Sequence, residues 1–237
     1  MLSVVSEVRV PRLREERNIG NKVVFILEKA HLELTPHRLG FTLLNSADHH
    51  GLIQESGRHP ADFRPDILHQ CLLSLQDSPL NRSGRLIVYI RTANNDVIEV
   101  HPQADIPRGY IHFTHMMVSL LLKRRVGATT ANLSLLQMVK GDFDALLPAG
   151  CRRVGLSVSG EDVQSLAKYM GDLVKEQEES KKPVVIVVGA VAKSDPTNKD
   201  ECDLVEDTIR ISRYGLSAAQ AIAKVLNEFE HLYKVCS

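Results

Sequence analysis

The segment best suited to holding a ligand is 183–193 (PVVIVVGAVAK), which reads as an apolar strand ending at Gly189. In open α/β sheets, ligands bind at the carboxyl ends of the strands. A glycine at that edge lets a ligand approach the backbone closely. The alternative is a glycine that only turns the chain, because glycines after strands are common. This segment alone leaves both interpretations open.

A second segment, 211–217 (ISRYGLS), places a Tyr-Gly turn between the end of a strand and the start of a helix. Its last residue, Ser217, is of a type preferred at helix N-caps. Backbone N–H groups gathered at such a turn can donate hydrogen bonds to a purine edge or to a carboxylate. The same residues also fit an ordinary junction between a strand and a helix.

A third candidate is Arg64-Pro65-Asp66, at the expected start of a helix over residues 65–76. Arginine is unfavourable beside the partial positive charge of a helix N-terminus, whereas aspartate is favourable there. An ion pair between Arg64 and Asp66 would fix the guanidinium group for contact with a phosphate. The alternative is a plain Pro-Asp helix start next to a surface arginine.

Several common catalytic motifs are absent. The sequence has no G-x-G-x-x-G after its first strand, no G-x-x-x-x-G-K-[ST] and no G-x-S-x-G, so the usual dinucleotide, P-loop and α/β-hydrolase sites lose their support. Its four cysteines form no C-x-x-C pair. The adjacent His49 and His50 would point to different faces of a helix, and we expect no metal site.

Composition narrows the class of protein. The 237 residues are 43% hydrophobic and 24% charged, which is typical of a globular α/β chain. Basic and acidic residues balance at 29 each, so an RNA site must be a local patch. Residues 82–125 hold seven basic and three acidic side chains, whereas residues 195–207 hold six acidic and one basic. The alternative for such charge runs is a solvated face.

The apolar spacing predicts the elements that would position these candidates. We expect a hairpin over residues 85–91 and 97–100, and an extended arm over residues 1–21. The alternation of strands and helices in the C-terminal half predicts a parallel sheet with helices on both faces. No apolar run reaches 18 residues, so we expect no membrane span and no membrane partner. The cysteine pattern and the lack of a signal-like apolar segment near Met1 favour an intracellular, reducing compartment. Strands are expected at 22–27, 154–158, 183–190 and 208–212, and helices at 40–55, 65–76, 114–125, 133–139, 162–178 and from Ser217 to about 235.

An ordered set of short motifs spans most of the chain, and it is specific even though each motif is short. These stretches are 41–45 (FTLLN), 64–71 (RPDILHQC), 75–81 (LQDSPLN), 84–90 (GRLIVYI), 98–102 (IEVHP), 106–108 (IPR), 187–192 (VVGAVA) and 214–218 (YGLSA). With them, the sequence resembles the eukaryotic and archaeal small-subunit rRNA pseudouridine methyltransferases. This family is called essential for mitotic growth or nucleolar essential protein, and it belongs to the SPOUT class.

The resemblance implies a knotted α/β SPOUT fold, in which a parallel central sheet has helices on both faces and an inserted hairpin. It implies one domain over residues 22–237, with an insertion near 38–110 and a trefoil knot within 151–237. It also implies a two-fold homodimer that works with ribosome-assembly proteins in the nucleus and nucleolus.

The implied reaction is transfer of a methyl group from S-adenosylmethionine to the N1 atom of a pseudouridine in small-subunit rRNA, which leaves S-adenosylhomocysteine. Arg64, Arg108 and His112 would bind the RNA. Asp66 would orient Arg64, with proton transfer only as a secondary role. Matching positions imply cofactor contacts from Leu156, Gly189, Ser194, Ile211, Ser212, Arg213, Tyr214, Gly215 and Leu216.

The chain departs from the family pattern at four positions. Asp105 and His112 stand where the family usually has arginines, Ser194 replaces a glycine, and Gly215 replaces a proline. His112 would help to bind RNA only when protonated. These departures keep a second hypothesis open, a non-catalytic RNA-binding assembly factor with the same fold. A third is a SPOUT methyltransferase that acts on tRNA.

Overall fold

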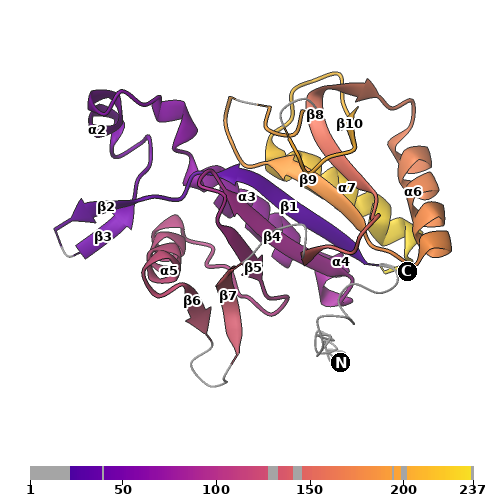
Figure 1. The fold of residues 1–237 in the computed structure, drawn as a ribbon, viewed down its shortest axis with the longest axis horizontal. Coiled ribbons are helices and arrows are strands. Elements are labelled where there is room, and N and C mark those ends of the chain that lie inside the picture. The colour runs from indigo at the N-terminus through magenta and orange to yellow at the C-terminus, as the bar shows by residue number, and fades with distance from the viewer. Residues whose placement is uncertain are drawn as a thin grey trace, which may run out of the picture.

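An eight-stranded sheet runs through the computed structural model, which describes residues 22–38, 40–127, 133–140, 146–193, 195–198 and 202–235 (Figure 1). The expected arm over residues 1–21 lies outside the described residues. The strand order is β10-β8-β9-β1-β4-β5-β7-β6. The strands are β1 (Val23–Ala30), β4 (Leu86–Thr92), β5 (Val97–Val100), β6 (Arg125–Gly127), β7 (Ser134–Val139), β8 (Arg153–Asp162), β9 (Val184–Gly189) and β10 (Asp207–Arg210).

Half of this sheet is parallel, as the sequence predicts. β10, β8, β9, β1 and β4 pair in parallel, and β4, β5, β7 and β6 continue in antiparallel pairs. The central strands β1 and β9 are runs of β-branched and aliphatic residues that are buried on both faces. The predicted hairpin is confirmed as β4 and β5, which turn at Asn95 with a φ of 62°.

Four long helices share one hydrophobic core with one face of the sheet. They are α3 (Pro65–Gln76), α5 (Tyr110–Lys123), α6 (Leu166–Ser180) and α7 (Ala218–Leu232). Among the described residues, the other face is covered by irregular segments that carry Leu146, Cys151, Cys202 and Leu204. The prediction of helices on both faces is therefore wrong for the described residues, because loops rather than helices complete the second core. Ser217 caps α7, because its hydroxyl accepts a hydrogen bond from the backbone N–H of Gln220.

A smaller lobe projects beyond one end of the sheet (Figure 1). It contains the hairpin of β2 (Leu34–His37) and β3 (Gly40–Leu43), the helix α2 (His50–Glu55), and the 3-10 turn η1 (Pro60–Asp62). The predicted helix over residues 40–55 is therefore wrong in its first half. The Asn45 side chain accepts a hydrogen bond from the backbone N–H of Asp48, so a turn separates the strand from the helix.

The predicted helix over residues 133–139 is also wrong. Residues 134–139 form β7, which pairs with β5 on one side and β6 on the other. A short apolar run such as SLLQMV fits a helix or a strand equally well by its periodicity. Pairing with distant strands decides the outcome, and that information is not local.

Candidate active site

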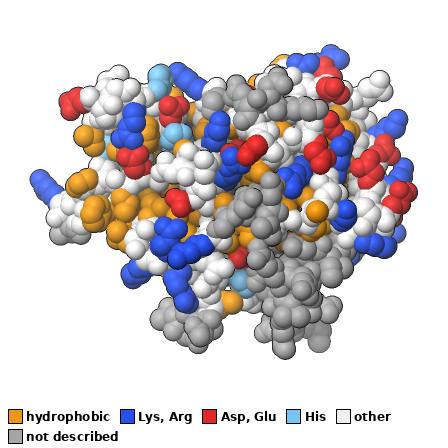
Figure 2. All heavy atoms as spheres, viewed as in Figure 1, with side chains coloured by type: hydrophobic (Ala, Val, Ile, Leu, Met, Phe, Trp, Pro, Cys, Tyr) orange, Lys and Arg blue, Asp and Glu red, His pale blue; other side chains and the backbone are white. Residues whose placement is uncertain are grey.

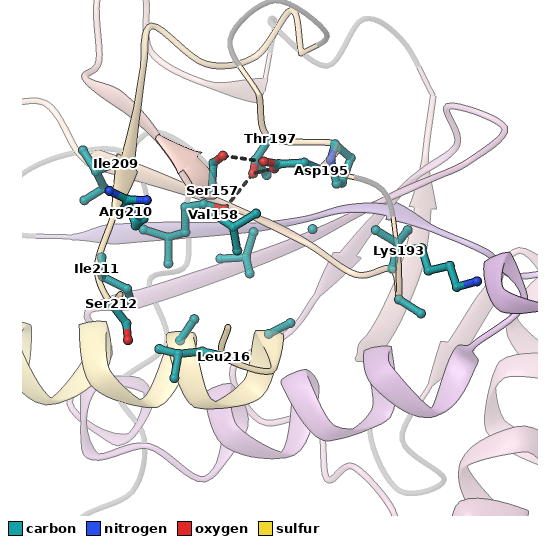
Figure 3. Close-up of a pocket in the computed structure, with 18 of the residues that line it drawn as sticks. Ser157, Val158, Lys193, Asp195, Thr197, Ile209, Arg210, Ile211, Ser212 and Leu216 are labelled. Atoms are coloured by element: carbon teal, nitrogen blue, oxygen red, sulfur yellow. Dashed lines mark hydrogen bonds between the residues drawn. The ribbon is translucent and has the colours of Figure 1, made fainter. Parts of the chain in front are cut away.

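A cavity of about 240 Å³ lies at the carboxyl ends of β8, β9 and β10, next to the start of α7 (Figure 3). This edge of the sheet is where open α/β folds bind their ligands. The two turns singled out in the sequence meet here, one after β9 and one after β10. The predicted contact residues that line the cavity are Leu156, Gly189, Ile211, Ser212, Tyr214 and Leu216.

The remaining predicted contact residues do not line this cavity. Arg213 and Gly215 belong to the same turn as Tyr214, but they are absent from the cavity wall. Ser194 lies outside the described residues. Within the turn, the Ser212 hydroxyl accepts a hydrogen bond of 3.1 Å from the backbone N–H of Tyr214. The turn is thus held by its own side chain before any ligand binds.

Gly189 also has a structural role that the sequence alone does not indicate. A Cβ atom at this position would lie 2.7 Å from Cγ and 2.9 Å from Cδ of Pro196. The missing side chain therefore makes room for the loop that returns over β9, and this packing fixes one wall of the cavity. Gly155 acts in the same way, because its Cβ would lie 2.7 Å from the carbonyl oxygen of Thr197.

The polar wall of the cavity is built around Asp195 (Figure 3). One carboxylate oxygen accepts hydrogen bonds from the hydroxyls of Ser157 at 2.5 Å and Ser159 at 2.9 Å. The other oxygen lies 3.1 Å from the Thr197 hydroxyl, which also donates to the Leu156 carbonyl at 2.7 Å. These bonds join the loop after β9 to the middle of β8, just beyond the residues that pair with β9.

The rest of the wall is mainly apolar. The side chains of Leu156, Val188 and Ile209 come from the strands, and those of Leu216 and Ala221 come from the turn before α7 and from α7 itself. A flat aromatic ring fits between such surfaces, and the backbone groups of the 211–216 turn lie beside it. This part of the wall suits a flat ring that is bound by shape and by backbone groups.

Arg64 and Asp66 form the ion pair that their spacing predicts, away from the residues that line this cavity. Nε and Nη2 of Arg64 donate to the two carboxylate oxygens of Asp66 at 2.8 and 2.7 Å. The hydrogen bonds from Arg64 hold the pKa of Asp66 below its usual value. Pro65 occupies the first turn of α3, where its missing N–H is not needed. The guanidinium plane is therefore fixed at the helix start.

Arg108 follows Pro107 beside the N-terminal half of α3, and its guanidinium group reaches the opposite end of this helix. Its Nη2 atom is 2.9 Å from a carboxylate oxygen of Asp77, the residue that ends this helix. The loop before Arg108 is held because Nε2 of His69 lies 2.6 Å from the Pro107 carbonyl oxygen. Asp66 and Asp77 are eleven residues apart, or about 16 Å along a helix. The two arginines therefore do not form one cluster but mark the two ends of α3.

The charge segregation seen in the sequence is partly neutralised inside the fold. Arg91 lies between two carboxylates. Its Nε atom is 3.6 Å from Oε1 of the buried Glu28, and its Nη1 atom is 2.7 Å from Oδ1 of Asp203 in the acidic segment 195–207. It is therefore not part of an exposed basic patch. The basic end of α5 does reach the surface, since Lys123 and Arg124 are exposed. Figure 2 shows blue side chains gathered in this region of the molecule.

His112 is exposed in the first turn of α5, and its ring centroid lies 6.4 Å from that of His115. Within the described part of the chain, no group of three or more His, Cys, Asp or Glu residues is arranged to hold a metal ion. None of the described helices is long and apolar enough to cross a membrane.

Most of this sequence matches a known protein family. The family model described as EMG1/NEP1 methyltransferase matches residues 25–230, which include both turns and all of α3. This chain belongs to the EMG1/NEP1 methyltransferase family. The resemblance stated from the short motifs is thereby confirmed.

Individual relatives of the EMG1/NEP1 family agree with this assignment. The Drosophila melanogaster protein named ribosomal RNA small subunit methyltransferase NEP1 is 39% identical over 218 residues, covering 90% of this chain and 83% of that protein. The Homo sapiens protein of the same name is 40% identical over 226 residues, covering 95% and 88%. The chain is also similar to the crystal structure of Archaeoglobus fulgidus Nep1 bound to S-adenosylhomocysteine, with a TM-score of 0.74 at 22% identity over 90% and 99% of the two chains. This likeness shows that the EMG1/NEP1 chain described here has the SPOUT-class fold.

Sequence reasoning missed the polar wall of the cavity in this EMG1/NEP1 chain. Asp195, Pro196 and Thr197 follow Gly189 closely, but the sequence shows them only as part of the acidic segment 195–207. Ser157 was placed in a strand and given no role. One signal could have found them: a polar Ser-x-Ser at the end of one strand and Asp-x-Thr just after the next one meet at the same sheet edge.

Proposed function

We propose that this protein transfers a methyl group from S-adenosylmethionine to the N1 atom of a pseudouridine in small-subunit rRNA. The observation that carries the proposal is the cavity between the Gly189 turn and the 211–216 turn, at the ligand-binding edge of the sheet. Family membership and the names of the relatives support methyl transfer to this class of RNA. The related Nep1 structure holds S-adenosylhomocysteine.

The residues of the cavity fit this cofactor. The apolar wall of Leu156, Val188 and Leu216 suits an adenine ring, and the backbone of the 211–216 turn offers hydrogen-bonding groups to its edge. The cofactor supplies a methyl group that is already activated by its sulfonium. The protein therefore has mainly to hold donor and acceptor in line, which lowers the entropic part of the barrier.

Arg64 and Arg108 bind the RNA backbone in this proposal. Asp66 orients Arg64 by accepting hydrogen bonds from its Nε and Nη2 atoms, and the Nη1 side of the guanidinium group is left to donate to a phosphate. The lowered pKa of Asp66 makes it a weak base, so proton removal from the acceptor nitrogen is assigned to solvent rather than to this carboxylate. The target base has to leave its stack to reach the cofactor, which suits a single-stranded loop.

The wider organisation follows from the same proposal. We assign residues 22–237 to one SPOUT domain, with an insertion near 38–110 and the knot within 151–237. A second copy of the chain is the proposed partner for an exposed apolar patch on β3 and α5, where Phe41, Ile111 and Leu122 are 50%, 69% and 54% exposed. Figure 2 shows hydrophobic side chains gathered on this side of the molecule. The protein would act with ribosome-assembly proteins in the nucleolus.

A second candidate function is a non-catalytic RNA-binding assembly factor. The observation in its favour is Gly215, which stands where the resemblance places a proline and around which an added Cβ would meet nothing within 4 Å. A turn that is both glycine-containing and open holds its backbone groups less rigidly. Asp105 and the exposed His112 stand where the family pattern has arginines, and this replacement weakens the contact with RNA.

Mass spectrometry of an RNA hairpin separates these functions. A hairpin with one pseudouridine in its loop is incubated with the protein and S-adenosylmethionine, and a uridine hairpin of the same sequence is the control. We expect the gain of one methyl group on the pseudouridine hairpin alone. Methylation of neither hairpin, together with tight binding of both, would support the assembly factor. Methylation of a tRNA fragment but not of the rRNA hairpin would assign a different substrate.

A further inference from the structure

Within the described part of the chain, the hydrogen bonds to the Asp195 carboxylate in the cavity wall come from hydroxyl groups. Ser157 and Ser159 donate to one of its oxygens, and the Thr197 hydroxyl lies next to the other. Among the described residues, none of the ion pairs involves Asp195. Hydroxyl groups fix the position of a carboxylate without neutralising its charge, so the wall carries a fixed negative charge.

The other charged side chains of the wall do not offset it. Arg210 is paired with Asp162 by two hydrogen bonds of 2.7 and 2.5 Å, so its charge is neutralised locally. Lys193 is exposed to solvent, and Figure 3 shows its side chain extending away from Asp195. The net field inside the cavity is therefore that of a carboxylate, and it favours a cation.

The cavity is small enough for the charge of Asp195 to act on a ligand anywhere inside it. A volume of about 240 Å³ corresponds to roughly 8 Å across, which is less than the Debye length of about 10 Å at moderate salt. S-adenosylmethionine carries one more positive charge than S-adenosylhomocysteine, because methyl transfer breaks the sulfur–methyl bond and leaves its electron pair on a neutral sulfur. The two ligands are otherwise alike, so a fixed charge separates them.

We propose that Asp195 is a specificity-determining residue that favours the cationic methyl donor over its neutral product. The inference rests on the proposed function, and it adds a role for the protein in releasing the product. Once the methyl group has left, the attraction between Asp195 and the ligand weakens and the product dissociates more readily. Ser157 acts as a positioning residue, because its hydroxyl makes the shorter hydrogen bond to the carboxylate, 2.5 Å against 2.9 Å for Ser159.

The test is calorimetric titration of the full chain and of Asp195→Asn with three ligands. These are S-adenosylmethionine, S-adenosylhomocysteine and sinefungin, a cationic analogue with an amine in place of the sulfonium. Asparagine keeps the shape and can still bond to the hydroxyls. We expect Asp195→Asn to weaken both cations about five- to tenfold and the neutral product less than about twofold. An equal loss for all three ligands, or no loss for any, would overturn the inference.

Two further measurements make the outcome specific. Ser159→Ala removes one hydroxyl but keeps the carboxylate, and it should preserve the preference for cations; if it abolishes that preference as fully as Asp195→Asn does, charge is not the cause. Thermal unfolding of both variants shows whether the loop after β9 is still packed. A wild-type chain that binds none of the three ligands would contradict the proposed function and, with it, this inference. Binding by the wild type with unchanged ligand ratios in Asp195→Asn would contradict the inference alone.

Discussion

The cofactor cavity and the arginines of α3 are built in different ways. The cavity is made of backbone turns, aliphatic side chains and a loop packed against two strand glycines, and its residues come from segments up to 65 positions apart, from Leu156 to Ala221. Arg64 is half-buried and Arg108 is exposed, and each is held by one carboxylate. Packing therefore determines the first region, and surface charge determines the second.

Because of this difference, binding of RNA and binding of the cofactor should respond differently to solution conditions. Contacts between arginines and phosphates release counterions, so RNA binding should fall steeply as salt increases. A cavity that binds by shape and backbone groups should be far less sensitive to salt.

Gly189→Ala should have the largest effect on the cavity. The added Cβ would lie within 3 Å of two atoms of the Pro196 ring, so the loop has to move. We expect more than a tenfold loss of S-adenosylmethionine affinity by calorimetry, and a free energy of unfolding lower by about 1–3 kcal/mol. Gly51→Ala is the matched control, because a Cβ there meets nothing within 4 Å and the residue lies in α2. Full affinity in Gly189→Ala would show that packing does not determine the cavity.

The buried carboxyl group of Glu28, in the central strand β1, should make the free energy of unfolding depend on pH. Burial raises its pKa from the usual 4.5 to about 7, although Arg91 acts in the opposite direction. The folded state thus binds the proton more tightly than the unfolded state, and stability falls as pH rises between these values. We expect a loss on the order of 3 kcal/mol from about pH 4.5 to pH 8.

Urea unfolding of Glu28→Gln against pH measures this contribution. Other groups titrate in the same range, so the difference between the two proteins is the quantity that reports on Glu28. The variant should lose the fall in stability that the wild type shows between these pH values. Parallel curves for the two proteins would mean that this carboxylate is not perturbed by burial.

Arg64→Ala should weaken RNA binding about five- to tenfold and reduce the slope of log affinity against log salt by about one. Its S-adenosylmethionine affinity should stay at the wild-type value, because Arg64 does not line the cavity. Arg108→Ala should behave in the same way. Lys175→Ala, an exposed cation on α6 paired with Asp172, is the control. Unchanged RNA affinity and salt slope in both arginine variants would refute their assignment.

Gly215→Pro should have the smallest effect. Its backbone φ is outside the left-handed region, and an added Cβ atom meets nothing within 4 Å. Proline at a compatible position stabilises a protein by about 0.4–1 kcal/mol, because it restricts the unfolded chain. We expect a gain of about two- to fivefold in cofactor affinity and a small rise in melting temperature. A loss of affinity would show that the open turn needs the freedom of glycine.

Prediction from sequence succeeded where the signal is local. The β-branched run before Gly189 marks a buried parallel strand, and Arg64 and Asp66 stand two residues apart, so their pairing needs no tertiary information. It failed where distant parts of the chain decide. Residues 134–139 become a strand because β5 and β6 pair with them, and residues 40–43 because β2 does.

The candidate site shows the same division. Both turns of the cavity were identified from the sequence, but the role of Gly189 was not, since Pro196 contacts it only after the loop returns over the sheet. Asp195 and Ser157 are 38 positions apart, and only the neighbouring ends of β8 and β9 bring them together. The pairing of Arg108 with Asp77 likewise depends on how the loop after β5 packs against α3.

The proposed function requires that the turns after β9 and β10 form one site for an adenosyl sulfonium compound. Calorimetric titration of the full chain with S-adenosylmethionine tests this most directly. The account predicts saturable binding with one site per chain, and loss of that binding in Gly189→Ala but not in Arg64→Ala. Absence of saturable binding by the wild-type protein, or equal loss in the two variants, would contradict it.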